Sequence, residues 1–276
     1  MKNRFSIFIC ALLVVGGSGC KRQSMDTDPD PGVLPGRNTK PDTRNFRAIR
    51  LSLYSIEVPA GMVSGSEDVW SYLNEEAVGV ETLTALGLNG LRVGLGQQSD
   101  WPYLAKLFRK LTGRKLTEGA STLRPGQVTQ ITLNVESPAK TLFIYQRDRT
   151  MYGSDFPVGD YLLAVSCTLD EDDPRKTLLT ALPQMRTSQV FTRRKITDDK
   201  VQVVSAPDLT SFKSVMFRLS IPDDGFIVIG PGSQSRRKSS LGSVMLRREK
   251  KGLPFENVLI LSAEIFSSRT TPVSVE

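Results

Sequence analysis

The sequence predicts an α+β protein, in which a small N-terminal β-α-α-β-α module precedes a β-rich module. The prediction rests on a change of periodicity along the 276 residues. Over residues 46–117, apolar residues recur at helical spacing between short strands. Over residues 118–271, strand-like apolar runs are separated by turn signals. The composition, with 39% hydrophobic and 24% charged residues, is that of a folded globular protein.

The first 20 residues have the pattern of an export signal. Two basic residues precede an apolar run over residues 5–15, which is too short to cross a membrane as a helix. Small residues then lead to Cys20. This pattern resembles the bacterial lipoprotein signal, although Gly17 stands where that family usually has Leu. The resemblance implies removal of residues 1–19, acylation of Cys20 and a lipid-anchored location in the cell envelope. The alternative is an ordinary signal peptide with a chance cysteine.

Residues 20–45 predict a flexible tether between the lipid and the folded domain. The stretch contains four prolines, several aspartates and few apolar residues, so it cannot build a core. Foldable sequence begins at Phe46, and residues 272–276 form a short tail.

The expected N-terminal module opens with a strand and a helix. Apolar residues at 49, 51 and 53 alternate with their neighbours in a strand that ends at Pro59. Ser64–Glu67 has the spacing of a capping box, which predicts the start of a helix. The apolar face of that helix consists of Val69, Trp70, Leu73 and Ala77.

Two further helices and a strand complete this module. Val80–Leu86 predicts a second helix, and Leu91–Leu95 predicts a strand. A third helix begins after Ser99 or Asp100, with an apolar face formed by Trp101, Leu104, Phe108 and Leu111. We therefore expect Trp70 and Trp101 to be core residues.

Strands dominate the expected second module. Turn signals rich in Gly, Pro and Asp separate them, and no helical pattern intervenes. A sandwich or a folded sheet is therefore expected. The predicted strands span residues 127–135, 140–147, 161–169, 177–182, 200–205, 215–221, 226–229 and 257–265.

The chain contains no histidine, which excludes many kinds of active site. Ser-His-Asp and Cys-His catalysis and zinc sites that contain histidine are impossible. Once Cys10 leaves with the signal and Cys20 is acylated, Cys167 is alone, so no internal disulfide is expected, and its apolar surroundings predict a buried, inert thiol. The sequence predicts no catalytic residue, no metal site and no cofactor. A hydrolase that uses two carboxylates stays open as an alternative.

Clusters of basic residues are the candidate binding elements, in a chain whose net charge is +7. They fall in or beside predicted loops of the β-rich module. Anionic lipid head groups, an acidic polymer or an acidic protein surface are candidate partners, and nucleic acid is not expected outside the cytoplasm. The alternative is a solvated positive face. The candidate anion-binding residues are Arg193, Arg194, Lys195, Arg236, Arg237, Lys238, Arg247 and Arg248.

Two resemblances point to the cell envelope. Residues 56–96, with IEVPAG, the segment that carries Trp70 and NGLRVGLG, resemble envelope lipoproteins of planctomycete-type bacteria. The segments VQVVSAP, DGFIVIGP, SSLG and VLILSAEIF, which begin at residues 201, 224, 239 and 258, occur in the order of segments found in bacterial secretins. Pro231 and Ser240 depart from the secretin pattern. The second resemblance implies a role in envelope assembly.

These observations predict a non-enzymatic, lipid-anchored envelope protein that binds another envelope protein or self-associates. The second hypothesis is a binding module for an anionic envelope polymer or for lipid head groups, which would use the basic loops. The third hypothesis is the histidine-free hydrolase. Salt separates the first two, because ionic binding weakens as salt rises and apolar contacts do not.

Overall fold

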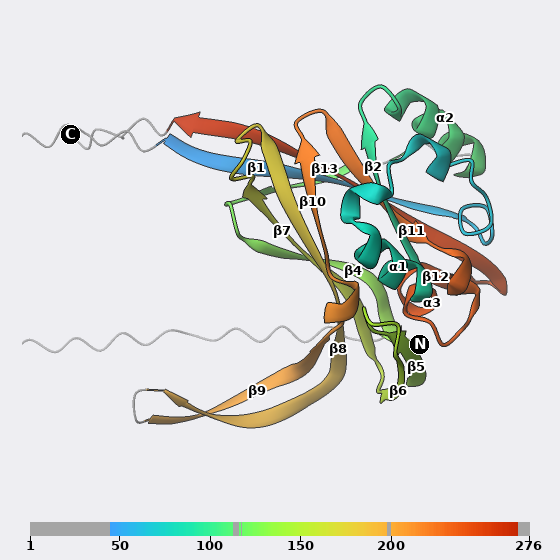
Figure 1. Cartoon of the computed structure of the whole chain (residues 1–276). Helices are drawn as coiled ribbons and strands as arrows, with labels where there is room; N and C mark the ends of the chain where they lie inside the picture. The colour runs from blue at the N-terminus through green and yellow to red at the C-terminus, as the bar shows by residue number, and fades with distance from the viewer. Residues whose placement is uncertain (1–44, 113–115, 117, 198–199, 270–276) are drawn as a thin grey trace, which may run out of the picture. The chain divides into compact units, whose positions relative to one another are not determined.

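A computed structural model describes residues 45–112, 116, 118–197 and 200–269, and this part of the chain is mostly β (Figure 1). The strands are β1 (Asn45–Pro59), β2 (Leu91–Gln97), β3 (Glu118–Leu123), β4 (Val128–Ser137), β5 (Lys140–Tyr145), β6 (Met151–Phe156), β7 (Gly159–Leu169), β8 (Lys176–Thr197), β9 (Lys200–Ser211), β10 (Phe217–Pro222), β11 (Gly225–Pro231), β12 (Arg247–Lys250) and β13 (Leu253–Arg269). The helices are α1 (Val80–Leu88), α2 (Trp101–Thr112) and α3 (Leu241–Leu246), and short 3-10 turns lie at Trp70–Tyr72, Glu76–Val78, Lys213–Val215 and Ser233–Arg236.

The strands form three antiparallel sheets. The first has the order β2-β11-β13-β1-β3, and β12 also pairs with β13. The second has the order β10-β8-β7-β4, and β9 also pairs with β8. Strands β5 and β6 form a separate hairpin. No helix among the described residues is both long and apolar enough to cross a membrane.

The predicted α+β fold with an N-terminal β-α-α-β-α module is wrong. Strand β1 pairs along its whole length with β13, from Asn45 opposite Arg269 to Pro59 opposite Phe255. Strand β2 pairs with β11, so the first sheet combines strands from both ends of the folded sequence. The predicted helix after Ser64 is absent, and turns and two 3-10 segments occupy its place. Local periodicity reports only which faces are apolar, and it carries no information on pairing between distant strands.

Other predicted elements are found close to their expected places. Helices α1 and α2 and strand β2 match the predicted second helix, third helix and second strand. Helix α3 and strands β3, β6 and β12 were not predicted. These elements are short or mainly polar, and short elements carry little periodic signal.

The two large sheets pack face to face over the main core. Alternate residues of β1 and β13, such as Leu51 and Leu261, point to the same core cluster as Leu163 of β7 and Leu179 of β8. Cys167 belongs to this cluster and is fully buried. Burial raises the pKa of its thiol to about 12, so the thiol is inert at neutral pH, as predicted.

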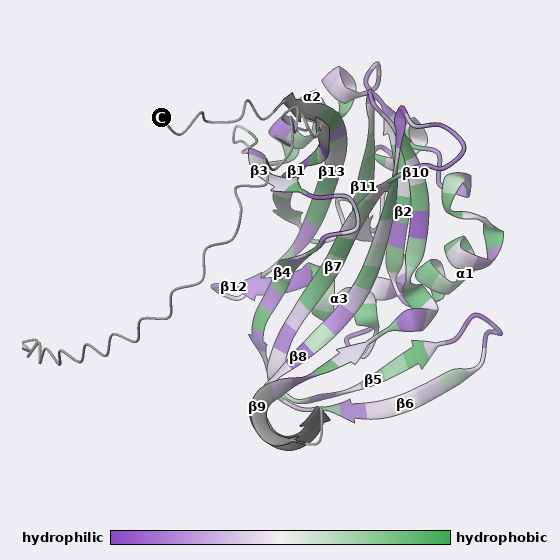
Figure 2. Ribbon diagram, turned by 90° about the vertical axis from the view of Figure 1, so that its left-hand side faces the viewer, coloured by the Kyte–Doolittle hydropathy of each residue, from purple (hydrophilic) through white to green (hydrophobic). Residues whose placement is uncertain are grey.

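The opposite face of the first sheet carries a second apolar cluster. Helix α2 contributes Leu104 and Phe108, and the segment after β1 contributes Trp70, which is 2% exposed. Trp101 packs against this cluster at the start of α2, so both tryptophans are packing residues, as predicted. Figure 2 shows the apolar residues of the central strands between these layers.

Two ends of the molecule matter for function. The start of β1 lies beside the end of β13, where Asn45 faces Arg269. Strand β12 pairs with the other end of β13, where Arg247 faces Glu256. At about 3.4 Å per residue, the two ends of β13 that carry these pairs are about 45 Å apart. The chain therefore enters the described domain far from β12.

Candidate anion-binding groove

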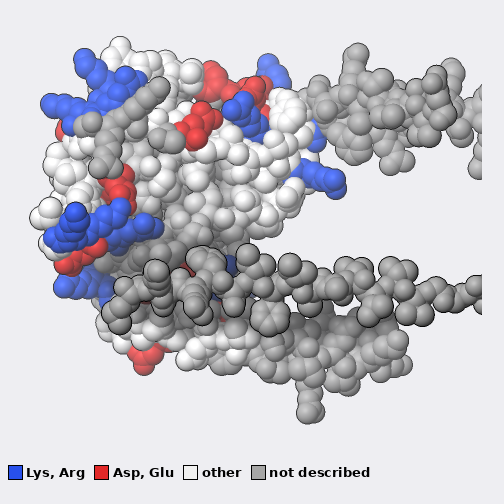
Figure 3. All heavy atoms as spheres, turned by 180° about the vertical axis from the view of Figure 1, so that it is seen from behind, with Lys and Arg blue, Asp and Glu red and all other residues white. Residues whose placement is uncertain are grey.

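Six basic residues line one groove of about 600 Å³. They come from three stretches of the chain that the fold brings together. Glu249 is the single carboxylate among the described lining residues. Figure 3 shows Lys and Arg gathered on the surface at the end of the molecule that carries β12. The basic lining residues are Lys140, Arg236, Lys238, Arg247, Arg248 and Lys250.

Hydrogen bonds fix the elements around the groove. The Ser240 side chain accepts the Ser243 N–H and so caps α3, which gives the helix a defined start. The Asn134 amide donates to the Val244 carbonyl at 2.9 Å and ties β4 to α3. The Gly242 N–H donates to the Asn89 carbonyl, and a Cβ on Gly242 would lie 2.0 Å from the Gly90 carbonyl oxygen. The close approach of these two backbones therefore requires glycine at 242.

Asn89 joins α1 to the strand at the edge of the groove region. Its buried amide donates to the carbonyls of Ala85 and Tyr145, and its side-chain oxygen accepts the Tyr145 N–H. Strand β5, which supplies Lys140, is thereby held at its far end. The Phe143 N–H donates to the Ser239 carbonyl, which places the loop after Arg236 beside this strand.

The positive charge of the groove is only partly neutralised. Glu57 lies 2.6 Å from Lys250 Nζ and 3.9 Å from Arg248, so one carboxylate serves two cations. Among the described residues, Lys140, Arg236 and Lys238 form no ion pair within 4 Å. The Nε of Arg248 is buried and has no hydrogen-bond partner. A buried donor without an acceptor is unusual, and an anionic oxygen would supply one.

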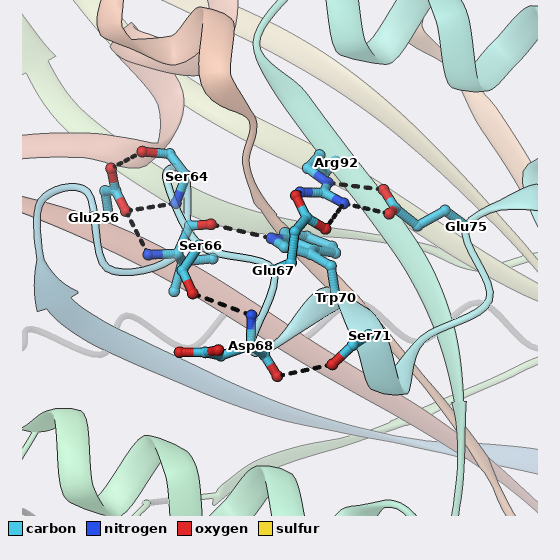
Figure 4. Close-up of polar contacts among 10 residues, drawn as sticks. Ser64, Ser66, Glu67, Asp68, Trp70, Ser71, Glu75, Arg92 and Glu256 are labelled. Carbon is cyan, nitrogen blue, oxygen red and sulfur yellow. Dashed lines mark hydrogen bonds and ion pairs between the residues drawn. The ribbon is translucent and has the colours of Figure 1, made fainter.

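Arg247 connects the groove to a buried carboxylate. Its guanidinium donates to the Ser235 carbonyl and lies 4.0 Å from Glu256 Oε1. Glu256 is completely buried and accepts the N–H groups of Gly61, Val63 and Ser64. It also accepts the Ser64 hydroxyl (Figure 4). These bonds satisfy the carboxylate and hold the segment after β1 against the sheet.

A second polar cluster holds the next part of this segment. Arg92 of β2 forms bidentate hydrogen bonds with both Glu67 and Glu75, and its guanidinium lies 4.5 Å from the Trp70 ring (Figure 4). Burial opposes the charge of Arg92, but the bonds to Glu75 and Glu67 outweigh it and raise its pKa. The Arg92 hydrogen bond lowers the pKa of Glu67. This cluster is paired internally, so it is structural rather than a free ligand site.

The structure brings together four of the eight predicted anion-binding residues. Arg236, Lys238, Arg247 and Arg248 line the groove. Arg237 lines a neighbouring hollow instead, and its guanidinium lies 5.5 Å from the Tyr145 ring. Lys140 was not among the predicted residues, because an isolated lysine at the start of a strand gives no signal of its own.

The remaining predicted residues lie elsewhere. Residues 193–195, expected in or beside a loop, lie near the end of β8 at Thr197, where Arg193 faces Val204 of β9 and Lys195 faces Gln202. Their side chains are outside the described part of the structure. Cys20, the expected signal and residues 20–44 of the expected tether also lie outside the described residues, whereas Asn45 begins β1.

Two other hollows have a different character. The Tyr72 and Tyr103 rings stack at 6.0 Å beside Lys106 and Lys110, in a hollow of about 340 Å³ with one carboxylate, Asp68. The hollow of about 280 Å³ that Arg237 lines contains no carboxylate. Neither these hollows nor the groove presents the two facing carboxylates that the hydrolase hypothesis requires. Within the described ranges, no group of three or more Asp, Glu or Cys residues is placed to hold a metal ion.

Comparisons with family models, curated proteins and solved structures gave no match. The resemblances to envelope lipoproteins and to secretins therefore stay predictions. The segments of the secretin-like pattern fall on β9, on β11, at the start of α3 and on β13. The geometry and charge of the groove are therefore the basis for a functional proposal.

Proposed function

We propose that this protein is a non-enzymatic, membrane-tethered binding protein, and that the groove binds phosphate or carboxylate groups of an anionic envelope component. One observation carries the proposal. Six basic side chains converge on a single groove, whose described lining contains one carboxylate. They are those of Lys140, Arg236, Lys238, Arg247, Arg248 and Lys250. Attraction of this kind draws an anion from within about 8–10 Å of the surface at ordinary ionic strength.

The bonding state of these cations supports a ligand rather than a structural role. Structural arginines are paired, as Arg92 is with its two glutamates. In the groove, by contrast, three cations have no carboxylate partner among the described residues, and a buried Arg248 donor has no acceptor. An anion bound across the groove would satisfy that donor and replace the missing counter-charges.

Binding of fluorescent inorganic polyphosphate, followed by anisotropy, tests this function. The double variant Arg236→Ser/Lys238→Ser removes two exposed, unpaired charges, and we expect about tenfold weaker binding. The matched control is Lys106→Ser/Lys110→Ser, which removes two charges from the surface of α2 and should leave the affinity within about twofold. Equal effects of both double variants would show nonspecific attraction and would contradict a groove site.

The proposed tether requires a separate test. Mass spectrometry of the N-terminal peptide from membranes should find Cys20 as the first residue, with acyl chains attached. A Cys20→Ala variant should leave the membrane fraction. If it stays as firmly bound as the parent, lipid anchoring at Cys20 is wrong, whereas the groove is unaffected.

A second candidate function, assembly with another protein, is favoured by the β8–β9 ribbon. Beyond Arg186 and Leu209 this two-stranded ribbon extends away from the sheets (Figure 1). An isolated two-stranded ribbon is marginally stable in water, so contact with a further strand would stabilise it. The native size in gently solubilised membranes tests this function. A particle of several hundred kilodaltons supports assembly, and a particle near the chain's own 30.5 kDa plus detergent contradicts it.

A further inference from the structure

The groove is bordered by large apolar side chains that extend into solvent. Val135 lines the groove and is 60% exposed. Leu253 faces Lys250 across the turn between β12 and β13 and is 62% exposed. A site for a soluble anion gains nothing from such side chains. Single exposed apolar side chains are common on proteins, so it is their position beside unpaired cations that favours contact with an apolar phase.

An apolar hollow lies on the other side of one loop of the groove. Arg236 and Lys238 line the groove, whereas Arg237 and Ser239 line the hollow, so alternate residues of this loop serve the two sites. The hollow, of about 280 Å³, is also lined by Phe143, Tyr145 and Met151. Phe143 and Met151 are 43% and 52% exposed.

Cationic and apolar groups therefore occupy one end of the molecule. Helix α3 contacts both β12 and β5, and Figure 1 shows these elements and β6 at this end. An anionic bilayer offers phosphates to the cations and an acyl boundary to the apolar side chains. A soluble polyanion offers only the charges. The combination thus fits a lipid surface better than a free polymer.

We propose that the end of the molecule formed by β12, α3 and the β5–β6 hairpin docks on an anionic phospholipid bilayer. Lys and Arg of the groove contact the head-group phosphates, and Leu253, Val135 and the β5–β6 hairpin enter the head-group layer. This inference rests on the proposed function, because the groove supplies the phosphate contacts. The docking end lies about 45 Å along β13 from the place where the chain enters the domain. The proposal therefore places the contacted bilayer at the opposite end of β13 from Asn45.

Vesicle sedimentation of an unacylated chain tests this proposal. Both core clusters lie within the described residues, so a chain that begins at Lys21 keeps the whole folded unit. We expect binding to phosphatidylglycerol vesicles and not to phosphatidylcholine vesicles. The variant Leu253→Ser/Val135→Thr should weaken vesicle binding by about tenfold, because it removes two apolar contacts. The single variant Leu253→Ser, whose side chain does not line the groove, should leave the binding of inorganic polyphosphate unchanged.

Val128→Thr is the matched control for the apolar contacts. Val128 lies on the same strand as Val135 and is equally exposed, at 60%, but it does not line the groove. Its substitution should leave vesicle binding unchanged.

Four outcomes would overturn the docking proposal, and they separate it from the groove function. Polyphosphate binding without vesicle binding would exclude the bilayer and leave the groove function intact. Vesicle binding that Leu253→Ser/Val135→Thr leaves unchanged would mean contact through charges alone. Equal binding to both lipids would exclude the role of the cations. Loss of both polyphosphate and vesicle binding would contradict the groove function itself.

Discussion

Arg247 and Glu256 face each other across the β12–β13 ladder, and their charged groups lie 4.0 Å apart. Glu256 has no exposed surface, and it accepts hydrogen bonds from three backbone N–H groups of the segment after β1. One buried carboxylate thus fixes both a covering segment of the first sheet and an arginine of the groove. The groove is consequently part of the folded framework rather than a feature of loose loops.

Removal of this carboxylate should destabilise the protein strongly. Glu256→Ala leaves the N–H groups of Gly61, Val63 and Ser64 without their acceptor in a buried place. We expect a loss of about 3–5 kcal/mol in the free energy of unfolding, measured by urea denaturation. Glu249→Ala is the control, because Glu249 is exposed, and it should change stability by less than about 0.5 kcal/mol. Equal stability of the two variants would refute the structural role of Glu256.

Glu249 offers a test in which binding should improve. It is the one carboxylate among the described residues that line the groove. Glu249→Gln removes its repulsion of an anion at a distance of several ångströms through water. We expect polyphosphate affinity to rise by about two- to threefold at low salt and by less as salt is added. An unchanged or lower affinity would mean that the anion does not lie in this groove.

Two glycine substitutions test the packing of the first sheet. A Cβ on Gly96 would lie 2.4 Å from the Phe226 ring, so Gly96→Ala should cost about 1–3 kcal/mol in unfolding free energy. A Cβ on Gly87 would meet nothing within 4 Å, and Gly87 lies inside α1. Gly87→Ala should therefore stabilise the protein by about 0.5–1 kcal/mol. Thermal unfolding should show a lower melting temperature for Gly96→Ala and a higher one for Gly87→Ala. A shift in the same direction for both variants would contradict the described packing.

Stability should depend on pH in a way set by carboxylates alone. A hydrogen bond from Arg186 lowers the pKa of Asp160, and one from Arg92 lowers that of Glu67. Because the folded pKa lies below the unfolded value of about 4, each group stabilises the fold above that value. The contribution is lost as the pH falls through the folded pKa. With no histidine in the chain, the urea midpoint should be nearly flat between about pH 5.5 and 8 and should fall below about pH 4.5.

Asp160→Asn identifies one of these contributions. The variant should be less stable than the parent at neutral pH and should approach the parent as the pH falls below about 3. A constant difference in stability across this range would show that the ionised form of Asp160 is not what stabilises the fold.

The position of the groove predicts that the protein can connect two bilayers. Coupling of a chain that begins at Cys20 to a maleimide lipid places its N-terminus on neutral vesicles. Cys167 should not compete, because it is buried and its pKa is raised to about 12. These vesicles should cluster with phosphatidylglycerol vesicles, as measured by light scattering. Absence of clustering, with sedimentation binding retained, would place the docking end on the anchoring bilayer.

Some features of the fold could be predicted from local sequence and others could not. The apolar stripe of Trp101, Leu104 and Phe108 predicted α2, because a helix satisfies its own backbone hydrogen bonds and needs no distant partner. The pairing of β1 with β13 joins residues more than 190 positions apart, and the local sequence of neither strand identifies its partner. The burial of Trp70 was predicted correctly from its apolar character. The helix expected around it is instead a short 3-10 turn, which local periodicity did not distinguish from an α-helix.

The site shows the same division. The runs Arg236–Lys238 and Arg247–Arg248 were visible as charge clusters. Their convergence depends on two short elements that were not predicted: α3, which lies between the two runs, and β12, which contains the second run. The separation of Arg237 from its two neighbours follows from the alternating sides of the loop, and composition cannot report it.

Hydrogen exchange with and without inorganic polyphosphate locates the bound anion on the chain and so decides whether the groove is the binding site. We expect slower exchange in peptides that cover residues 134–140 and 236–250 when polyphosphate is bound. Peptides of α2, which carries the competing cations Lys106, Arg109 and Lys110, should exchange at the same rate in both samples. Slower exchange confined to α2, or binding without any protection around the groove, would contradict the groove as the binding site.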